Sequence, residues 1–435
     1  MSAPAKRFLT TFVAPKPNKT LIQAMTWANR WLNLYGTPGL RDVPYLNRLP
    51  LVRGLCDIRH LDLPAADDVR LKATLAADGM VFITPNHPEF FTDWMLDKEI
   101  AARYAPMMAN WATHDIVNGM GRWGQKFWLA NNLVAQVPGD TEQALAYSID
   151  TAAAGTPVLL HPEGSVHWQG DHINTLFQGA AKMALQAAAQ SSKPVFIQPL
   201  IWKLKFIRNE ESALHAEMAQ VERQLQIEAK PFLNLPLRLA RLYRHVLWLR
   251  FQNMGFAPPR HLSFFAAQDV LLEKLLLSLN EFGTFSGSLN EQAKQMLGAI
   301  RQAEKSGQSI DRMTRRRRSE LAFILRNPQE VYHQPRWQQE HIAECLKRLR
   351  CDHLAWGGLG NKIHRFVPRP VGGRNAHIRV AEPLNIRALL AEQPDLDAAA
   401  LTALLQQQMQ QTLDQLNVEL NTARSPQEYA NPFVL

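Results

Sequence analysis

Short apolar runs alternate with longer amphipathic stretches between Leu71 and Leu200. The apolar runs have the length of buried strands and lie at residues 81–84, 133–137, 158–161 and 195–200. Two stretches between them, residues 141–154 and 180–189, carry apolar residues at helical spacing. This alternation predicts βαβ units, so we expect an α/β fold with a mixed central sheet flanked by helices.

The pattern changes after Trp202, where helical periodicity takes over. Helices are expected at residues 210–229, 271–280, 290–305 and 338–350, and a strand returns at residues 376–380 before a helix at residues 397–420. We therefore divide the chain into four parts. These are an N-terminal helical segment at residues 1–60, a core at 61–205, a large and mainly helical insertion at 206–372, and the last core strand with a C-terminal helix at 373–435.

Two polar loops follow predicted strands and hold the residues best suited to catalysis. The first reads Asn86-His87-Pro88-Glu89-Phe90-Phe91-Thr92-Asp93, and the second reads His161-Pro162-Glu163-Gly164-Ser165. A neutral imidazole can take a proton from a hydroxyl, and a carboxylate that accepts a hydrogen bond from its other nitrogen fixes the ring. His87 is therefore the candidate base, and Asp93 is the candidate that orients it. Asp93 also suits the N-cap of a helix that starts near Trp94.

The order of these motifs resembles that of the glycerolipid acyltransferase superfamily, whose members acylate glycerol phosphate and lysophospholipids. In that superfamily an N-H-x-x-x-x-D motif supplies the base and the orienting acid, and a block of the form F-P-E-G-T-R-S binds the acceptor. Residues 86–93 and 161–167 are similar to these two blocks, residues 176–180 to a stretch P-F-K-K-G-A, and residues 377–384 to the ending V-R-x-G-E-P-I. The resemblance implies a glycerol-phosphate acyltransferase-like fold in which His87 and Asp93 are catalytic.

The resemblance also implies a substrate class and further site residues. A fatty acyl group would pass from acyl-CoA or acyl carrier protein to a hydroxyl or amine of a lipid or lysolipid acceptor, with no metal and no bound cofactor. Backbone amides near Gly164 would help stabilise the oxyanion. The acceptor-binding candidates are His161, Glu163, Gly164, Ser165, His167 and Arg122, and the acyl-pocket candidates are Phe90, Phe91 and Trp94. The aromatic residues fit a plain core equally well, and Glu163 fits a carboxylate that only accepts backbone hydrogen bonds.

The chain departs from the superfamily pattern in the loop length and in the acceptor site. Five residues, instead of four, separate His87 from Asp93. Val166 and Val137 stand where two arginines would grip an acceptor phosphate. A phosphate-bearing acceptor then requires a substitute cation, for which the candidates are His161, His167, Arg122 and Lys182. The alternative is a non-catalytic lipid- or carrier-protein-binding module of the same fold, whose longer loop no longer aligns the pair.

Composition indicates a globular protein of a reducing compartment. The 435 residues are 46% hydrophobic and 20% charged, and the three cysteines lack the spacing of a disulfide framework or a zinc site. The N-terminus lacks a secretory signal, and no apolar stretch of about twenty residues is present. Residues 119–124 fit G-x-G-x-x-G but follow no strand directly, so nucleotide binding is not expected there. We expect a cytoplasmic protein that is soluble or peripheral at the inner membrane surface.

A net charge of +9 indicates an acidic partner, such as anionic lipid, acyl carrier protein, coenzyme A or nucleic acid. An apolar stripe at residues 21–35 fits a membrane-interfacial helix or a core-packing one. Residues 238–245 carry a basic face that would suit anionic headgroups, or the solvated face of a buried helix. The run at residues 315–318 is typical of an exposed helix turn. We expect an anionic membrane surface as a partner and no nucleic acid.

Overall fold

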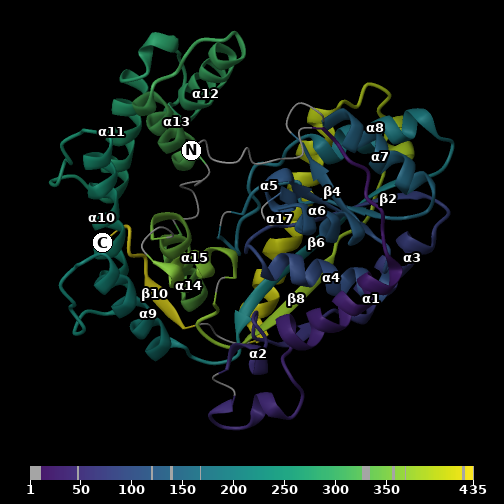
Figure 1. Cartoon of the computed structure of the whole chain (residues 1–435), viewed down its shortest axis with the longest axis horizontal. Coiled ribbons are helices and arrows are strands. Elements are labelled where there is room, and N and C mark those ends of the chain that lie inside the picture. Colours follow the sequence, from purple (N-terminus) through teal and green to yellow (C-terminus); the bar gives the residue numbers. More distant parts are fainter. Residues whose placement is uncertain are drawn as a thin grey trace. The chain divides into compact units, whose positions relative to one another are not determined.

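The computed structural model describes residues 11–46, 49–118, 121–137, 141–166, 168–325, 334–354, 358–367, 369–423 and 427–434. The chain forms two compact units (Figure 1). The first contains Met1–Arg208 and Phe366–Ser425, and the second contains Asn209–Arg365 and Pro426–Leu435. The second unit therefore includes most of the predicted insertion and also the last residues of the chain.

The first unit is built on an eight-stranded sheet of mixed direction, as predicted. Its strands are β1 (Ile58–Asp62), β2 (Met80–Pro85), β3 (Ala109–Thr113), β4 (Leu133–Gln136), β5 (Val158–Leu159), β6 (Val195–Phe206), β8 (Arg374–Val380) and β9 (Leu384–Asn385). The order across the sheet is β1-β8-β6-β2-β5-β3-β4, with β9 beside β6. The strands from β6 to β4 run parallel, whereas β8 and β9 run antiparallel to β6.

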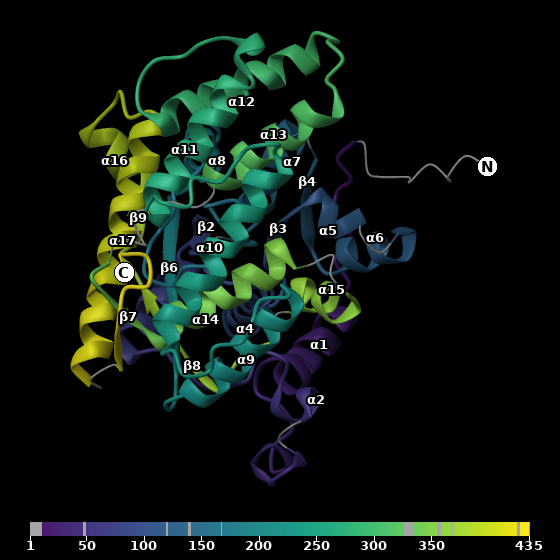
Figure 2. The same cartoon turned by 90° about the vertical axis from the view of Figure 1, so that its left-hand side faces the viewer.

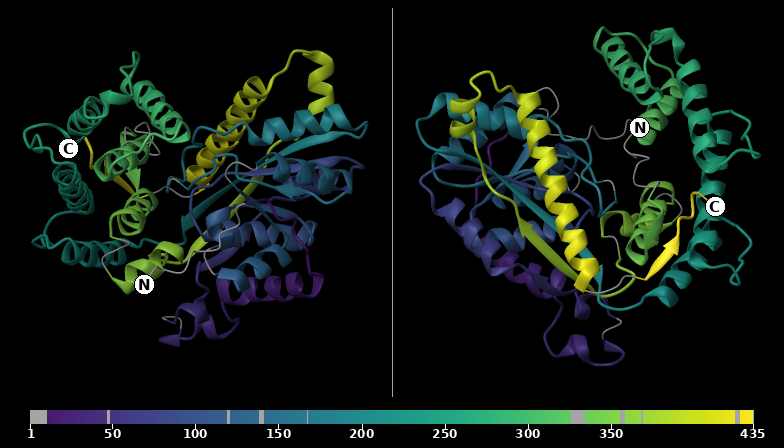
Figure 3. Two further views of the ribbon diagram at one scale, coloured as in Figure 1. Left: turned by 45° about the horizontal axis from the view of Figure 1, so that its top comes forward. Right: turned by 180° about the vertical axis from the view of Figure 1, so that it is seen from behind.

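Helices cover both faces of this sheet. They are α1 (Lys19–Ala28), α2 (Pro50–Arg53), α3 (Ala65–Ala76), α4 (Thr92–Tyr104), α5 (His114–Asn118), α6 (Gly121–Ala130), α7 (Thr141–Ala153), α8 (Gly179–Gln190), α16 (Ile386–Glu392) and α17 (Ala398–Ala423). The 26-residue α17 follows α16 and lies across the sheet (Figures 2 and 3).

The alternation of side chains along β2 explains the two-sided core. Met80 and Phe82 pack with α7, α8 and α17, whereas Val81 and Ile83 pack with α3 and α4 on the opposite face. Successive strand residues point to opposite faces, so a strand that is apolar throughout must be covered on both sides. All six residues of β2 are buried accordingly.

The second unit is mainly helical and has its own core. It contains α9 (Glu211–Gln224), α10 (Leu235–Asn253), α11 (Phe264–Leu277), α12 (Leu289–Lys305), α13 (Arg312–Leu325), α14 (Gln339–Arg348) and α15 (Leu359–Phe366). The end of the chain returns here because β10 (Glu428–Ala430) pairs antiparallel with β7 (Arg336–Gln338). Phe433 then packs against the rings of Tyr243, Phe264 and Trp337.

The predicted apolar stripe at residues 21–35 does not match the buried positions. Ile22, Asn29 and Leu34 are buried, whereas Leu32 and Trp27 are exposed. The helix changes from α1 to a π-helix, η1 (Asn29–Leu34), and this wider turn shifts the side chains around the axis. The Asn29 amide donates to the carbonyl of Met95, so η1 packs on α4.

The basic face predicted at residues 238–245 is only partly exposed, because Arg241, Arg244 and His245 are half-buried and Arg238 is buried. Arg238 is buried on α10, where its guanidinium donates two hydrogen bonds to the Glu222 carboxylate at 2.7 and 3.2 Å. This buried ion pair makes the Arg238 guanidinium unavailable to a lipid headgroup. Across the described ranges, none of the helices combines the length and the hydropathy needed to cross a membrane.

Candidate active site

The topology of the sheet brings the two polar loops together. Strands β2 and β5 are parallel neighbours in which Ile83 is paired with Leu159. The loop that contains His87 follows β2, and the loop that contains His161 follows β5. Because carboxyl ends of adjacent parallel strands meet at one edge, both histidines lie at the same end of the sheet.

His87 and Asp93 are hydrogen-bonded. The Nδ1 atom of His87 lies 3.0 Å from Oδ2 of Asp93, and the Asp93 side chain is completely buried. The same Oδ2 accepts a hydrogen bond from the amide of Glu89 at 2.7 Å. Since the carboxylate accepts from Nδ1–H, the lone pair that can take a proton belongs to Nε2.

The longer loop is compatible with this pairing because one residue adopts an unusual backbone conformation. Phe91 has a φ of 68°, in the left-handed region, and α4 begins directly after it at Thr92. The alternative in which Asp93 caps a helix at Trp94 is therefore wrong, since Asp93 lies inside the first turn. Its carboxylate instead reaches back to the loop.

Glu163 is buried and connects the two loops through hydrogen bonds. Its Oε1 accepts from the His87 amide at 2.6 Å, and its Oε2 accepts from the Asn174 amide at 2.7 Å. The side chain is only 1% exposed. These contacts match the second interpretation of Glu163, a carboxylate that holds backbone amides, and place it behind the histidines.

Gly164 adopts a left-handed φ of 67°, and the space beside it is filled by the ring of Phe177. A Cβ atom at this position would lie 2.6 Å from that ring, so only glycine fits without a shift. The Gly164 amide donates to the carbonyl of His161 at 3.1 Å. The amide of Gly164 itself is therefore already used within the loop, and the expectation that backbone amides near Gly164 stabilise an oxyanion stays a prediction for its neighbours.

A buried ion pair holds the first loop against the distant strand β8. Arg374 donates to Oε2 of Glu89 at 2.6 Å and to the carbonyl of Cys56 at 2.9 Å. The other oxygen of Glu89 accepts from the hydroxyl of Thr92 at 2.6 Å. Glu89 therefore ties the turn between His87 and Asp93 to the sheet.

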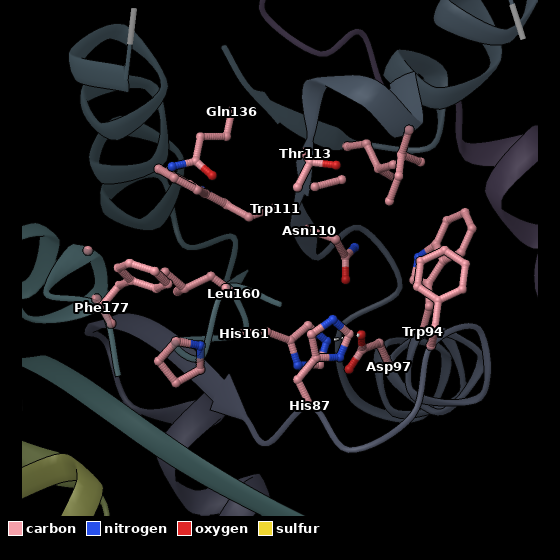
Figure 4. A pocket seen from close by; sticks show the side chains of 18 of the residues that line it. His87, Trp94, Asp97, Asn110, Trp111, Thr113, Gln136, Leu160, His161 and Phe177 are labelled. Atoms are coloured by element: carbon pink, nitrogen blue, oxygen red, sulfur yellow. Dashed lines mark hydrogen bonds and ion pairs between the residues drawn. The ribbon is translucent and has the colours of Figure 1, made fainter. Parts of the chain in front are cut away.

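His161 forms a second histidine–aspartate pair, which is not among the predictions made from the sequence. Its Nε2 lies 2.9 Å from Oδ2 of Asp97, and its Nδ1 lies 3.1 Å from the carbonyl oxygen of Asn86. The rings of His161 and His87 are stacked, with centroids 4.1 Å apart and planes inclined by 20° (Figure 4). Asn86 is itself fixed, because its side chain exchanges two hydrogen bonds with the backbone of Trp202 on β6.

Burial shifts the titration of these groups. Desolvation raises the pKa of Asp93 well above its usual range; the hydrogen bond from Glu89 opposes this shift, and the carboxylates of Glu89, Asp97 and Glu163 reinforce it. Desolvation likewise raises the pKa of Glu163 to about 8. For His161, burial acts to lower the pKa, but Asp97 and Glu163 outweigh it and the pKa is raised.

The two histidines line a cavity of about 310 Å³. This volume lies at the lower end of the range for small-molecule sites. Of the predicted residues, those that line it are His87, His161, Gly164, Phe90, Phe91 and Trp94. The aromatic candidates thus form part of its apolar wall. No arginine or lysine is among the described residues that line the cavity.

Other predicted residues lie elsewhere. Arg122 is exposed on the first turn of α6 and Lys182 is exposed on α8, and neither lines the cavity. Ser165 and Glu163 belong to the second loop but are not part of the cavity wall either. His167 lies outside the described residues, as do Gly119 and Met120 of the dismissed glycine motif.

The cavity also contains polar residues that the sequence did not suggest. Asn110 on β3 is 2% exposed, and its amide nitrogen donates to the carbonyl of Met108 at 2.9 Å. This bond fixes the orientation of the amide, and its oxygen has no hydrogen-bond partner among the described residues. In Figure 4 the Asn110 side chain points toward the two histidines. Thr113 and Gln136, at the ends of β3 and β4, complete this polar side.

Comparisons with known proteins leave the family open. No model of a known protein family matches the chain. A search of curated proteins likewise finds no significant match.

Within the parts of the chain that the structure describes, no three histidine, cysteine or acidic side chains are grouped to hold a metal ion.

Proposed function

We propose that this protein is an acyltransferase of the glycerolipid acyltransferase type, with His87 as the general base. The single observation that carries the proposal is the hydrogen bond from His87 to the buried Asp93 at the mouth of a largely apolar cavity. The superfamily fold is part of the proposal, and the motif order along the mixed sheet supports it.

The reaction balances with these groups alone. Nε2 of His87 takes the proton of an acceptor hydroxyl or amine as its oxygen or nitrogen attacks the thioester carbonyl carbon of acyl-CoA or acyl carrier protein. The new ester or amide bond forms, the carbon–sulfur bond breaks, and the departing thiolate receives the proton from the imidazolium. Asp93 holds the ring in the required tautomer and stabilises its charged form.

The cavity favours an acceptor whose reacting end carries no phosphate. Phosphate sites in proteins rely on arginine or lysine, and the described lining residues include neither. The polar residues Asn110, Thr113 and Gln136 of the cavity wall would form hydrogen bonds with a hydroxyl or amine of the acceptor. Phe90, Phe91 and Trp94 would contact the acyl chain. The substrate class is therefore a lipid-type alcohol or amine.

Peripheral attachment to an anionic membrane is part of the same proposal. The net charge of +9 supports it, and a lipid acceptor requires access to a bilayer. Sedimentation with vesicles that contain anionic lipid, compared with neutral vesicles, tests this attachment. Equal recovery in both supernatants would contradict it.

The test of activity uses labelled acyl donor and matched acceptors with and without phosphate, read by mass spectrometry. We expect transfer to acceptors without phosphate, and a decrease of roughly 10²- to 10⁴-fold in kcat for His87→Ala. Asp93→Asn should also lose activity. His60→Ala is the control, because His60 is exposed on β1. Full activity in His87→Ala contradicts the proposal, and carrier or lipid binding without any turnover would indicate a non-catalytic member of the fold.

A further inference from the structure

The contacts of His161 determine how many protons its ring carries. A carbonyl oxygen only accepts hydrogen bonds, so Nδ1 of His161 must carry the hydrogen that it shares with Asn86. Nε2 faces the carboxylate of Asp97 at 2.9 Å, which also accepts when it is ionised. The pair therefore has two possible states. In the first, both ring nitrogens of His161 are protonated and Asp97 is a carboxylate; in the second, the proton between Nε2 and Oδ2 belongs to Asp97 and the ring is neutral.

The first of these states fits the surroundings better. A neutral ring beside a protonated Asp97 would leave two buried neutral groups where a charge-assisted hydrogen bond can form. Oδ1 of Asp97 is buried without a hydrogen-bond partner, so the imidazolium is the one described group that balances this carboxylate through a hydrogen bond. His161 is thus best described as a fixed cation in a buried ion pair.

This cation lies directly on the candidate base. The rings of His161 and His87 are stacked with centroids 4.1 Å apart, and His87 meets its own carboxylate, Asp93, on the edge that carries Nδ1. A buried carboxylate favours the charged form of its imidazole partner, which would leave His87 protonated and unable to act as a base. A second positive charge stacked on the ring opposes that effect.

We propose that His161, held as an imidazolium by Asp97 and Asn86, keeps the stacked His87 neutral so that it can accept a proton. His161 is thus a positioning and electrostatic residue, one that acts through the base and not on the substrate. The proposal rests on the proposed function for its catalytic meaning, but the charge state of His161 can be measured without any substrate.

Several other charged groups lie near the two rings, and together they determine whether protonation of His87 is favoured or opposed. Asp93 and Asp97 extend from α4. Glu163 of the second loop lies near both His161 and Asp93, and Glu89 acts on Asp93 but is paired with Arg374 of β8. Lys98 on α4 lies near Asp97. Asp93 and Asp97 favour protonated rings, and Glu163 does so when it is ionised. Among the described groups that contact His87, the stacked cation is the one that opposes its protonation.

The test is nitrogen NMR of histidine-labelled protein, with resonances assigned by single-histidine variants. In the wild-type protein we expect both ring nitrogens of His161 to remain protonated across the pH range in which His87 titrates. In Asp97→Asn the amide can donate to Nε2, so His161 becomes neutral with its hydrogen on Nδ1. We expect the midpoint of the His87 titration to rise by about one pH unit or more, with the acid limb of kcat/KM moving equally.

The matched control is Asp78→Asn, because Asp78 is an exposed aspartate of the same unit. It should change neither the His161 spectrum nor the His87 midpoint. A bare Nε2 or Nδ1 on His161 of the wild-type protein near neutral pH overturns the proposal, and this measurement needs no variant that must fold. An unchanged or lower His87 midpoint in folded Asp97→Asn overturns it as well. If the NMR pattern is found but the wild-type protein transfers no acyl group, the proposed function fails while the charge assignment stands.

Discussion

Glu163 offers the sharpest distinction between binding a substrate and holding the site together. Replacement by glutamine keeps its shape but turns one acceptor oxygen into an NH₂ group. Because both oxygens accept backbone amides, the new NH₂ must face the amide of His87 or that of Asn174. A buried amide left without an acceptor costs about 1–3 kcal/mol, and Glu163→Gln should lose about this much in its free energy of unfolding at low pH.

The loss should depend on pH. Burial raises the pKa of Glu163 from its ordinary value of 4.5 to about 8, so the folded protein retains a proton that the unfolded chain releases. The stabilising contribution of this carboxyl is fully present below about pH 4.5 and disappears as the pH rises through about 8. Within this window one proton corresponds to a slope of about 1.4 kcal/mol per pH unit. Glutamine has no such slope. Between pH 5 and pH 8 the wild-type protein should lose about 4 kcal/mol, which is more than the deficit of the variant, so the difference should shrink and then change sign, with Glu163→Gln the more stable protein near pH 8.

Urea unfolding at pH 5, 6, 7 and 8 measures this difference directly, provided that the m-value is unchanged. Glu392→Gln is the control, because Glu392 is exposed at the end of α16. A difference that stays constant with pH would refute the view that Glu163 is a neutral, buried carboxyl in the folded state. Unchanged stability together with a higher KM for the acceptor would restore the first prediction, that Glu163 binds the acceptor.

Three further variants test the geometry of the site. Arg374→Met should cost about 3–5 kcal/mol in urea unfolding because it removes the guanidinium that neutralises the buried Glu89, and adding Glu89→Gln should recover part of this loss; strictly additive effects would argue against direct coupling. Gly164→Ala should cost about 1–3 kcal/mol through its left-handed backbone and the contact with Phe177, and Phe177→Ala should relieve only the contact; equal costs in both backgrounds would show that the contact is unimportant. Arg122→Ala should leave kcat/KM unchanged because the side chain is exposed outside the cavity, and a clear rise in the KM of the acceptor would contradict this placement.

The strands that the sequence predicts are those with continuous apolar runs. The predicted runs at residues 81–84 and 133–137 correspond to β2 and β4 almost residue for residue. The strand β3 (Ala109–Thr113) is not predicted, because Asn110 and Thr113 interrupt its apolar pattern. Both residues line the cavity, so the site itself removes the signal. The strand β1 (Ile58–Asp62) is not predicted either, since it lies at the sheet edge and three of its five residues are polar.

The parts of the site differ in how far local spacing reveals them. Asp93 is predicted because it follows His87 within one loop. Asp97 lies four residues after Asp93 on α4, and helical spacing alone places the two carboxylates on one face, so the sequence does carry a signal for this residue. Arg374 is beyond the reach of local patterns, because it pairs with Glu89 across 285 positions and nothing nearby marks it.

The buried charged groups of the site together set the proton affinity of His87. Glu89 is neutralised by Arg374, and Asp97 is balanced by His161. The raised pKa of Glu163 keeps it mostly protonated at neutral pH. Asp93 is hydrogen-bonded to the candidate base itself, and its burial makes the Asp93–His87 pair take up a proton more readily. A base that binds protons too tightly is already protonated before the substrate arrives. The stacked cation of His161 lowers the proton affinity of His87 and so opposes the effect of the buried Asp93.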